Sequence, residues 1–143
     1  MTPPGETAPP GAYVVVDASV VVAALVDPSP AGVWAERLLM SAPLAAPHLL
    51  TVEAANILRR LSRAGHIPAD IASLAHADLV ELRVALFPYE PVADRVWALR
   101  DTVTAYDAWY VALAEELDAP LATLDAKLAT APGPACTFLQ PPA

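Results

Sequence analysis

Four acidic residues of this chain could together bind a divalent metal ion. The four are Asp17 after YVVV, Glu53 in LTVEAANILRRLSRAGHI, Asp107 in AYDAWYVALAEEL and Asp125 after LATL. Ionised carboxylates that gather within a few ångströms repel one another, so at least one pKa rises unless a cation lies among them. Oxygen ligands without His or Cys at metal spacing are typical of Mg²⁺ or Mn²⁺. Such an ion assists phosphodiester hydrolysis by activating a water molecule and stabilising the leaving oxygen.

Each acid taken alone also has a structural explanation. An Asp after a strand often caps the next helix, which applies to Asp17 and Asp125. Glu53 can act in a capping box or with the helix dipole, and Asp107 can serve the same dipole. Capping does not require acids to converge, however. Asp17 and Asp125 both close apolar strands, at what should be the same edge of a parallel sheet, and this agreement favours a shared site.

Polar neighbours of these acids support a shared site. Ser19 and Thr123 each lie two positions from an acid, where a hydroxyl can orient a carboxylate or a bound water. A local turn or cap hydrogen bond explains either hydroxyl equally well. Asn56 follows Glu53 by about one helical turn and shares its helix face. Tyr110, one turn after Asp107, can line the cleft, although core packing is its simpler explanation.

The elements around these acids are expected to alternate between strand and helix. The pattern predicts strands over 13–17, 43–50, 83–90, 121–125 and 136–140, and helices over 18–26, 32–42, 50–67, 69–82, 91–103, 105–117 and 126–131. Thr51 is expected to cap the longest helix and Gly65 to end it. Several strands are continuously apolar, which predicts an α/β fold with a central parallel sheet and helices on both faces. Ligands bind outside the carboxyl ends of such strands.

Length and composition indicate one domain with a large core. The chain has 143 residues, of which 56% are hydrophobic, and a mean hydropathy of +0.44. We expect a disordered Pro-rich leader over 1–12, with no features of a secretory signal, and a domain over 13–143. No apolar run reaches the roughly 18 residues that span a membrane. Cys136 is the single cysteine and is expected to be a small buried thiol, so a reducing cytoplasm is the simplest setting.

The charge balance restricts the possible partners. A net charge of −8 and a pI near 4.6 argue against nucleic-acid binding through bulk electrostatics. A basic partner or a metal ion suits such a chain better. The sequence contains neither GxGxxG nor GxxxxGKS, which weakens nucleotide binding as an interpretation.

Four stretches in chain order resemble the PIN-domain ribonucleases, in particular the VapC toxins of bacterial toxin–antitoxin pairs. They are VVVDASVVVAAL, LTVEAANILRR, TAYDAWYVALAEEL and LATLDAKLA. The resemblance extends from Tyr13 to Gln140. It implies a PIN-like nuclease domain over 13–143, Mg²⁺- or Mn²⁺-dependent endoribonuclease activity that inhibits translation or growth, a homodimer, and a VapB-type antitoxin whose tail occupies the site.

By position, the resemblance assigns catalytic and metal-binding roles to Asp17, Glu53 and Asp107. Asp125 would bind the metal directly or through water, with Ser19 and Thr123 in support. A basic antitoxin tail suits the acidic chain, and the apolar surplus can form the dimer and antitoxin surfaces.

RNA contact would depend on local basic groups. Arg59, Arg60 and Arg63 follow Glu53 on the same predicted helix, and a solvated helix face is their simpler explanation. The low Lys and Arg content suggests that shape and local contacts select one structured RNA.

Three other functions fit less well. A phosphatase of the haloacid dehalogenase type needs a second Asp two residues after the first, where Ser19 stands. A phospho-accepting receiver domain needs paired acids at the first strand end and a lysine at a later strand end, whereas Lys127 follows Asp125. A catalytically inactive PIN-like binding module is the non-enzymatic alternative, and the presence of all four acids argues against it.

Histidine and tryptophan residues carry weaker signals. His48, His66 and His76 lack zinc spacing and are expected to be structural or exposed. The three tryptophans, Trp34, Trp97 and Trp109, are expected in the core or in an interface rather than as RNA-stacking platforms.

Overall fold

A computed structural model describes residues 9 and 11–143 of the chain, so most of the expected 1–12 leader lies outside the described residues. The strands are β1 (Val14–Val16), β2 (Leu44–Pro47), β3 (Ala85–Phe87), β4 (Leu121–Ala122) and β5 (Phe138–Leu139). The helices are α1 (Ala18–Val26), α2 (Pro30–Ser41), α3 (Leu49–Arg63), α4 (Ala69–Glu81), the 3₁₀ turn η1 (Glu90–Val92), α5 (Ala93–Ala98), α6 (Ala105–Glu116) and α7 (Ala126–Thr130).

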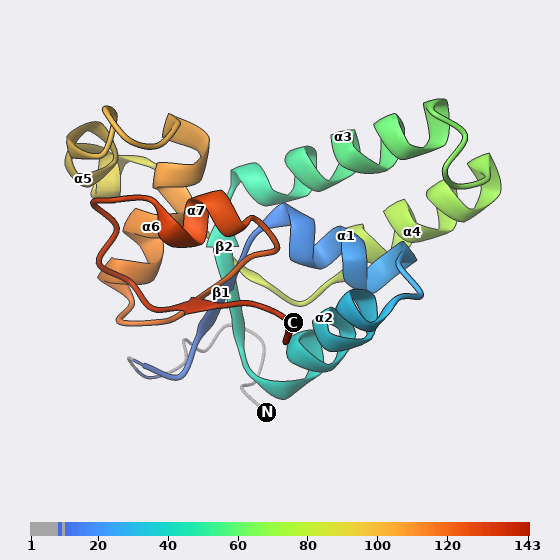
Figure 1. The fold of residues 1–143 in the computed structure, drawn as a ribbon, viewed down its shortest axis with the longest axis horizontal. Helices are drawn as coiled ribbons and strands as arrows, with labels where there is room; N and C mark the ends of the chain where they lie inside the picture. The colour runs from blue at the N-terminus through green and yellow to red at the C-terminus, as the bar shows by residue number, and fades with distance from the viewer. Residues whose placement is uncertain (1–8, 10) are drawn as a thin grey trace.

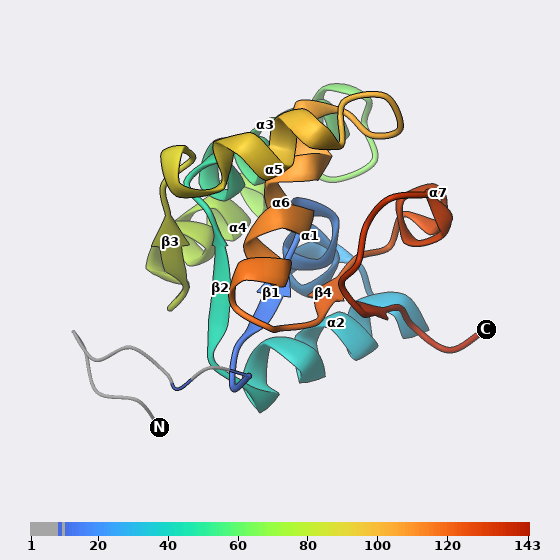
Figure 2. The same cartoon turned by 90° about the vertical axis from the view of Figure 1, so that its left-hand side faces the viewer.

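Within the described part of the chain, five strands form one parallel sheet in the order β3-β2-β1-β4-β5. The chain builds the sheet outward from β1 to β3 and then crosses to the other side of β1 to add β4 and β5. Figure 2 shows β3, β2, β1 and β4 side by side. The carboxyl ends of β1 and β4 therefore flank the point where the strand order reverses. Open α/β sheets bind their ligands at such a point.

Helices cover both faces of the sheet, which confirms the predicted α/β architecture. Figure 1 shows α1 to α4 on one side of the strands and α5 and α6 on the other. On the first side α1 packs against α2, α3 and α4, whereas α6 packs against α5, β1 and β2. The core between these layers is apolar and includes Val15, Val16, Val20, Leu50 and Leu121, all fully buried. Burying such side chains is the main driving force for this arrangement.

The longest helix begins earlier than predicted, so the expected N-cap at Thr51 is wrong. α3 starts at Leu49, and His48 occupies the cap position with helical backbone angles and no side-chain cap. The N–H of His48 donates to the carbonyl of Phe87 (3.0 Å), which turns the chain directly from β2 into the helix. Glu53 consequently lies in the second turn, where the helix dipole has little effect. Gly65 ends the helix as expected, with a φ of +78° that favours glycine.

A glycine allows α2 to lie close to the end of α1. A Cβ atom at Gly32 would lie 1.7 Å from the carbonyl oxygen of Asp27 and 2.6 Å from its carbonyl carbon. The side chain of Asp27 accepts a hydrogen bond from the N–H of Ser29 (2.8 Å) just before α2. The junction therefore depends on a residue without a side chain.

The segment over residues 133–135, which precedes β5, is hydrogen-bonded to Arg95 of α5 and Glu115 of α6. Arg95 donates from Nε to Oε1 of Glu115 (2.7 Å) and from Nη2 to Oε2 (3.2 Å). Oε2 of Glu115 also accepts from the N–H of Ala135 (2.7 Å), and Arg95 donates to the carbonyl of Gly133 (2.9 Å). Arg95 holds the pKa of Glu115 below its usual value, against the effect of burial.

The described residues contain no single helix that is both long and apolar enough to cross a membrane. By length and composition, α1 and α2 pass this test only as a pair, and the chain bends by 109° between them.

Candidate active site

Asp17 lies where β1 passes into α1, and its carboxylate also caps that helix. Oδ1 accepts hydrogen bonds from the N–H of Val20 (3.1 Å) and from the hydroxyl of Ser19 (2.5 Å). The Thr123 hydroxyl donates to the same carboxylate. Burial still raises the pKa of Asp17, and the charge of Asp107 adds to this effect. Asp17 is therefore a helix cap and at the same time an acid held in a poorly solvated place.

Two hydroxyl groups connect Asp17 to the loop after β4. Ser19 Oγ accepts from the N–H of Leu124 (3.2 Å) while it donates to Asp17. Thr123 Oγ1 accepts from the N–H of Asp125 (3.0 Å), and Thr123 is fully buried. Both hydroxyls thus contact Asp17. Thr123 also makes the local bond considered as its alternative explanation, whereas the bond between Ser19 and Leu124 spans 105 positions of the chain. The carboxyl ends of β1 and β4 are linked through these side chains.

Glu53 lies on α3 and receives its hydrogen bond from another helix. The hydroxyl of Tyr110 on α6 donates to Oε1 of Glu53 (3.0 Å). Burial raises the pKa of Glu53, and the charges of Asp107 and Asp17 add to the rise, while Tyr110 and Arg60 oppose it. Burial and these same acids raise the pKa of Tyr110, so its hydroxyl stays protonated and remains a donor.

Asp107 is fixed by a residue that the sequence interpretation missed. Thr104 is the N-cap of α6, and its Oγ1 accepts from the N–H of Asp107 (3.2 Å). Burial and the charge of Asp125 raise the pKa of Asp107, and the Thr104 hydroxyl, which also interacts with this carboxylate, opposes the rise. The order T-x-x-D before an apolar run is a capping box, and it was the signal available in the sequence.

Asp125 is exposed at the N-terminus of α7. Its Oδ1 accepts from the N–H groups of Lys127 (2.9 Å) and Leu128 (3.4 Å), so its capping explanation is correct. Its charge nevertheless acts on Asp107. We call Asp17, Glu53, Asp107 and Asp125 the acidic cluster, because each interacts electrostatically with at least one of the others.

The donor chemistry of the acidic cluster fits Mg²⁺ or Mn²⁺. Its ligands are all carboxylate oxygens, and the repulsion between them is relieved when a cation lies among them. Within residues 9 and 11–143, however, no three His, Cys, Asp or Glu side chains are arranged so that they could hold a metal ion. In Asp17, Glu53 and Asp125 one carboxylate oxygen already accepts a hydrogen bond. Binding a cation would therefore require the carboxylates to turn toward one another.

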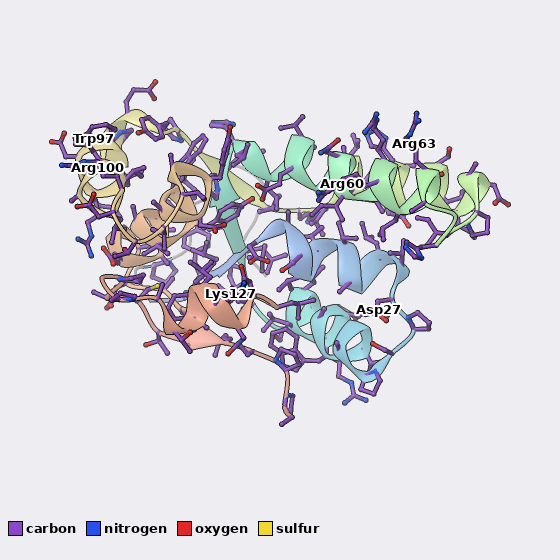
Figure 3. The ribbon with its side chains drawn as sticks, turned by 45° about the horizontal axis from the view of Figure 1, so that its top comes forward. Asp27, Arg60, Arg63, Trp97, Arg100 and Lys127 are labelled. Atoms are coloured by element: carbon purple, nitrogen blue, oxygen red, sulfur yellow. The ribbon has the colours of Figure 1, made fainter. Side chains whose placement is uncertain are left out.

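The remaining predicted site residues lie at the surface of α3. Asn56 is exposed, and no hydrogen bond of the described residues joins it to Glu53. The exposed arginines Arg59, Arg60 and Arg63 continue along the helix, and only Arg60 has a charge that acts on Glu53. Figure 3 shows Arg60 and Arg63 on one arm of the molecule and Trp97 with Arg100 at the opposite end of the view.

Trp97 is more exposed than a core position allows. It has a relative exposure of 66%, and the Arg100 guanidinium lies 4.8 Å from its ring centroid. Trp34 and Trp109 are partly buried against the core. All three histidines, His48, His66 and His76, are exposed.

An open hollow of about 500 Å³ lies away from the acidic cluster, at the C-terminal end of α6. Glu115, Asp118, Cys136 and Thr137 are among its lining residues. Burial raises the pKa of Cys136 to about 11, so the thiol stays protonated and unreactive.

Comparison with known proteins identifies close relatives. The family described as "PIN domain" matches residues 14–134. The chain is 42% identical over 123 residues to ribonuclease VapC1 of Mycobacterium tuberculosis, covering 85% of this chain and 92% of that protein.

Two solved structures are similar in fold. VapC20 of M. tuberculosis, described as a sarcin-ricin loop cleaving toxin, has a TM-score of 0.61 at 17% identity, covering 81% of this chain and 92% of that one. VapBC2 from Rickettsia felis, bound to a promoter DNA fragment, has a TM-score of 0.63 at 12% identity, covering 89% and 97%. At such identities these structures show the fold alone.

Proposed function

The chain belongs to the PIN-domain family and, within it, to the VapC ribonucleases, and we propose that it is an endoribonuclease that depends on Mg²⁺ or Mn²⁺. It would be the toxin of a toxin–antitoxin pair and would inhibit translation or growth by hydrolysing RNA phosphodiesters. The observation that supports this proposal is the electrostatic interaction among Asp17, Glu53 and Asp107, three acids from separate elements of which Asp17 directly follows β1.

In this proposal the cation is held by Asp17, Glu53 and Asp107, and by Asp125 directly or through a water. When bound, it would polarise the scissile phosphate and a water molecule. Ser19 and Thr123 hold the Asp17 carboxylate through their hydroxyls.

RNA binding would rest on a few local contacts. Arg59, Arg60 and Arg63 form an exposed row on α3 that begins near Glu53, and the remainder of the chain is acidic. Asn56 lies between Glu53 and this row and would contact the RNA backbone or a bound water. Such a surface selects a structured RNA by shape rather than by general affinity.

The partners would be a second copy of the chain and a VapB-type antitoxin with a basic tail, in the cytoplasm. The exposed large apolar side chains would provide the surfaces for these partners. They are Val33, Met40, Val52, Ile71, Leu74, Val80, Leu86, Trp97 and Tyr106. Where such side chains form one contiguous patch, they mark a protein–protein interface. Trp97 with Arg100 has the composition of an interface hot spot.

RNA cleavage by purified variants tests the enzymatic proposal. Asp17→Asn and Asp107→Asn should abolish Mn²⁺-dependent cleavage of total RNA while the circular dichroism spectrum stays that of the wild type. Asp27→Asn is the matched control, because Asp27 lies at the α1–α2 junction and an amide oxygen can still accept from Ser29. Unchanged cleavage in either cluster variant refutes the mechanism. A wild type that binds an antitoxin but cleaves no RNA would support the inactive binding module instead.

A further inference from the structure

Tyr110 is the one fully buried phenol whose hydroxyl contacts the acidic cluster in the described residues. Its relative exposure is 1%, and its hydroxyl donates to Oε1 of Glu53 at 3.0 Å. Tyr110 lies three residues after Asp107 on α6, so both side chains project from the same face of that helix. A single helix thus supplies one acid of the cluster and the hydrogen-bond donor for another.

The bond connects two helices whose main packing partners differ, apart from β2. α3 packs mainly on α1, α4 and β2, whereas α6 packs mainly on α5, β1 and β2. Figure 1 shows these helices on the two sides of the strands, with the beginning of α3 near the beginning of α6. The position of Glu53 relative to Asp107 is therefore set by this side-chain contact in addition to the backbone of α3.

Glu53 would otherwise be free to move. It is half-buried on α3, and a glutamate side chain has several rotamers of similar energy unless a partner selects one. The phenol ring is itself held by the core on every side, so its hydroxyl is a fixed donor. A carboxylate that is held in place beforehand loses less freedom when it binds a cation.

We propose that Tyr110 is a positioning residue of the active site, whose buried hydroxyl holds the Glu53 carboxylate next to Asp107 and so strengthens cation binding. This inference rests on the proposed metal-dependent function. Tyr110 would not contact the RNA or the reacting atoms, and it would act only through Glu53.

The variant Tyr110→Phe tests this role, because it removes the hydroxyl and keeps the ring that fills the core. We expect Mn²⁺ binding, measured by calorimetry, to weaken by about tenfold, the usual effect of losing a residue that orients a metal ligand. RNA cleavage should need about tenfold more Mn²⁺ for half-maximal rate and should recover at saturating Mn²⁺. The matched control is Tyr89→Phe, since the Tyr89 hydroxyl makes none of the hydrogen bonds found in the described residues.

Action through Glu53 requires two further measurements. Adding Tyr110→Phe to a Glu53→Ala chain should cause no additional loss of Mn²⁺ affinity, because alanine has no oxygen that could accept from the Tyr110 hydroxyl. Glu53→Asp shortens the acid beyond reach of the phenol and should weaken Mn²⁺ binding at least as much as Tyr110→Phe. Should Tyr110→Phe fail to fold, an Mn²⁺ affinity of Glu53→Asp equal to that of the wild type would overturn the positioning role, because the carboxylate would then bind the cation equally well without the phenol.

The outcomes separate this inference from the proposed function. A wild type that binds no Mn²⁺ and cleaves no RNA overturns both. A wild type that binds and cleaves, with a folded Tyr110→Phe of equal Mn²⁺ affinity, overturns the positioning role alone. An equal loss of affinity in the presence and absence of Glu53→Ala would also overturn it, since Tyr110 would then act independently of Glu53.

Discussion

Removing the Ser19 hydroxyl should weaken both the fold and the acidic site. This hydroxyl donates to the Asp17 carboxylate at 2.5 Å and accepts from the N–H of Leu124 at 3.2 Å. A hydrogen bond to a charged group contributes about 1.5 to 3 kcal/mol, and a partly buried N–H without a partner costs about 1 kcal/mol or more. Ser19→Ala should therefore lower the free energy of unfolding by about 3 kcal/mol. For a chain of this length that corresponds to a fall in Tm of about 10 °C.

Thermal unfolding followed by circular dichroism at neutral pH in EDTA measures this effect. Ser41→Ala is the matched control, because the Ser41 hydroxyl is exposed and donates only to the carbonyl of Leu38 in its own helix. A calorimetric Mn²⁺ titration should in addition show affinity reduced by about tenfold or more, since Asp17 loses a hydrogen bond that orients it. A Tm for Ser19→Ala within about 2 °C of that of Ser41→Ala would refute the stability argument. A large fall in Tm with unchanged Mn²⁺ affinity would refute the positioning argument.

Three further results are expected. Gly32→Ala places a methyl group 1.7 Å from the carbonyl oxygen of Asp27. It should lower the free energy of unfolding by about 2 kcal/mol in a urea titration, although alanine favours helix; an unchanged midpoint would contradict this. Burial raises the pKa of Asp17, Glu53 and Asp107 in the folded chain above the ordinary values of 3.8 for Asp and 4.5 for Glu. At a pH between the ordinary pKa of the unfolded chain and the raised pKa of the folded chain, the folded chain therefore binds more protons. The Tm in EDTA should consequently rise as the pH falls from neutral toward those ordinary values, and Asp17→Asn should flatten this rise and have a higher Tm at neutral pH; a wild-type Tm that only falls on acidification would contradict it. Glu115→Gln should lower the free energy of unfolding by about 1 kcal/mol at neutral pH, because the pair with Arg95 is partly exposed. Since the pKa of Glu115 is lowered, its stabilisation is present above about pH 4.5 and is lost as the pH falls through the native pKa, so urea titrations of wild type and variant should converge in acid.

Much of the fold follows from local signals. The helix predicted over 18–26 has the observed bounds of α1, because Asp17 caps its start and Asp27 with Pro28 ends it. Gly65 similarly ended α3 where expected. The predicted start of α3 was wrong because the observed start depends on the hydrogen bond from His48 to Phe87, two residues that come together only when the chain folds. Strands were predicted too long for a related reason, since pairing with neighbours sets their ends.

The acidic residues were recognisable because each occurs at a boundary between a strand and a helix or near a helix start. Thr104 could also have been found, since its capping box with Asp107 is contained in four residues. The contact between Tyr110 and Glu53 could not, because the two residues are 57 positions apart and belong to helices with different main neighbours. The periodicity of apolar residues in α3 and α6 indicates which side of each helix faces inward, but it does not indicate which polar side chains contact each other there.

The capping bonds of Asp17 and Asp125 make folding and chemistry share the same carboxylates. Oδ1 of each residue accepts backbone N–H groups at the start of a helix. An asparagine at either position keeps an oxygen for the helix and gives up the negative charge, whereas an alanine gives up both. A homologue without catalytic activity could therefore keep this fold by replacing Asp17 or Asp125 with asparagine, which has one amide oxygen and one amide nitrogen in place of the two carboxylate oxygens. Inactive copies made for binding studies are best built in the same way.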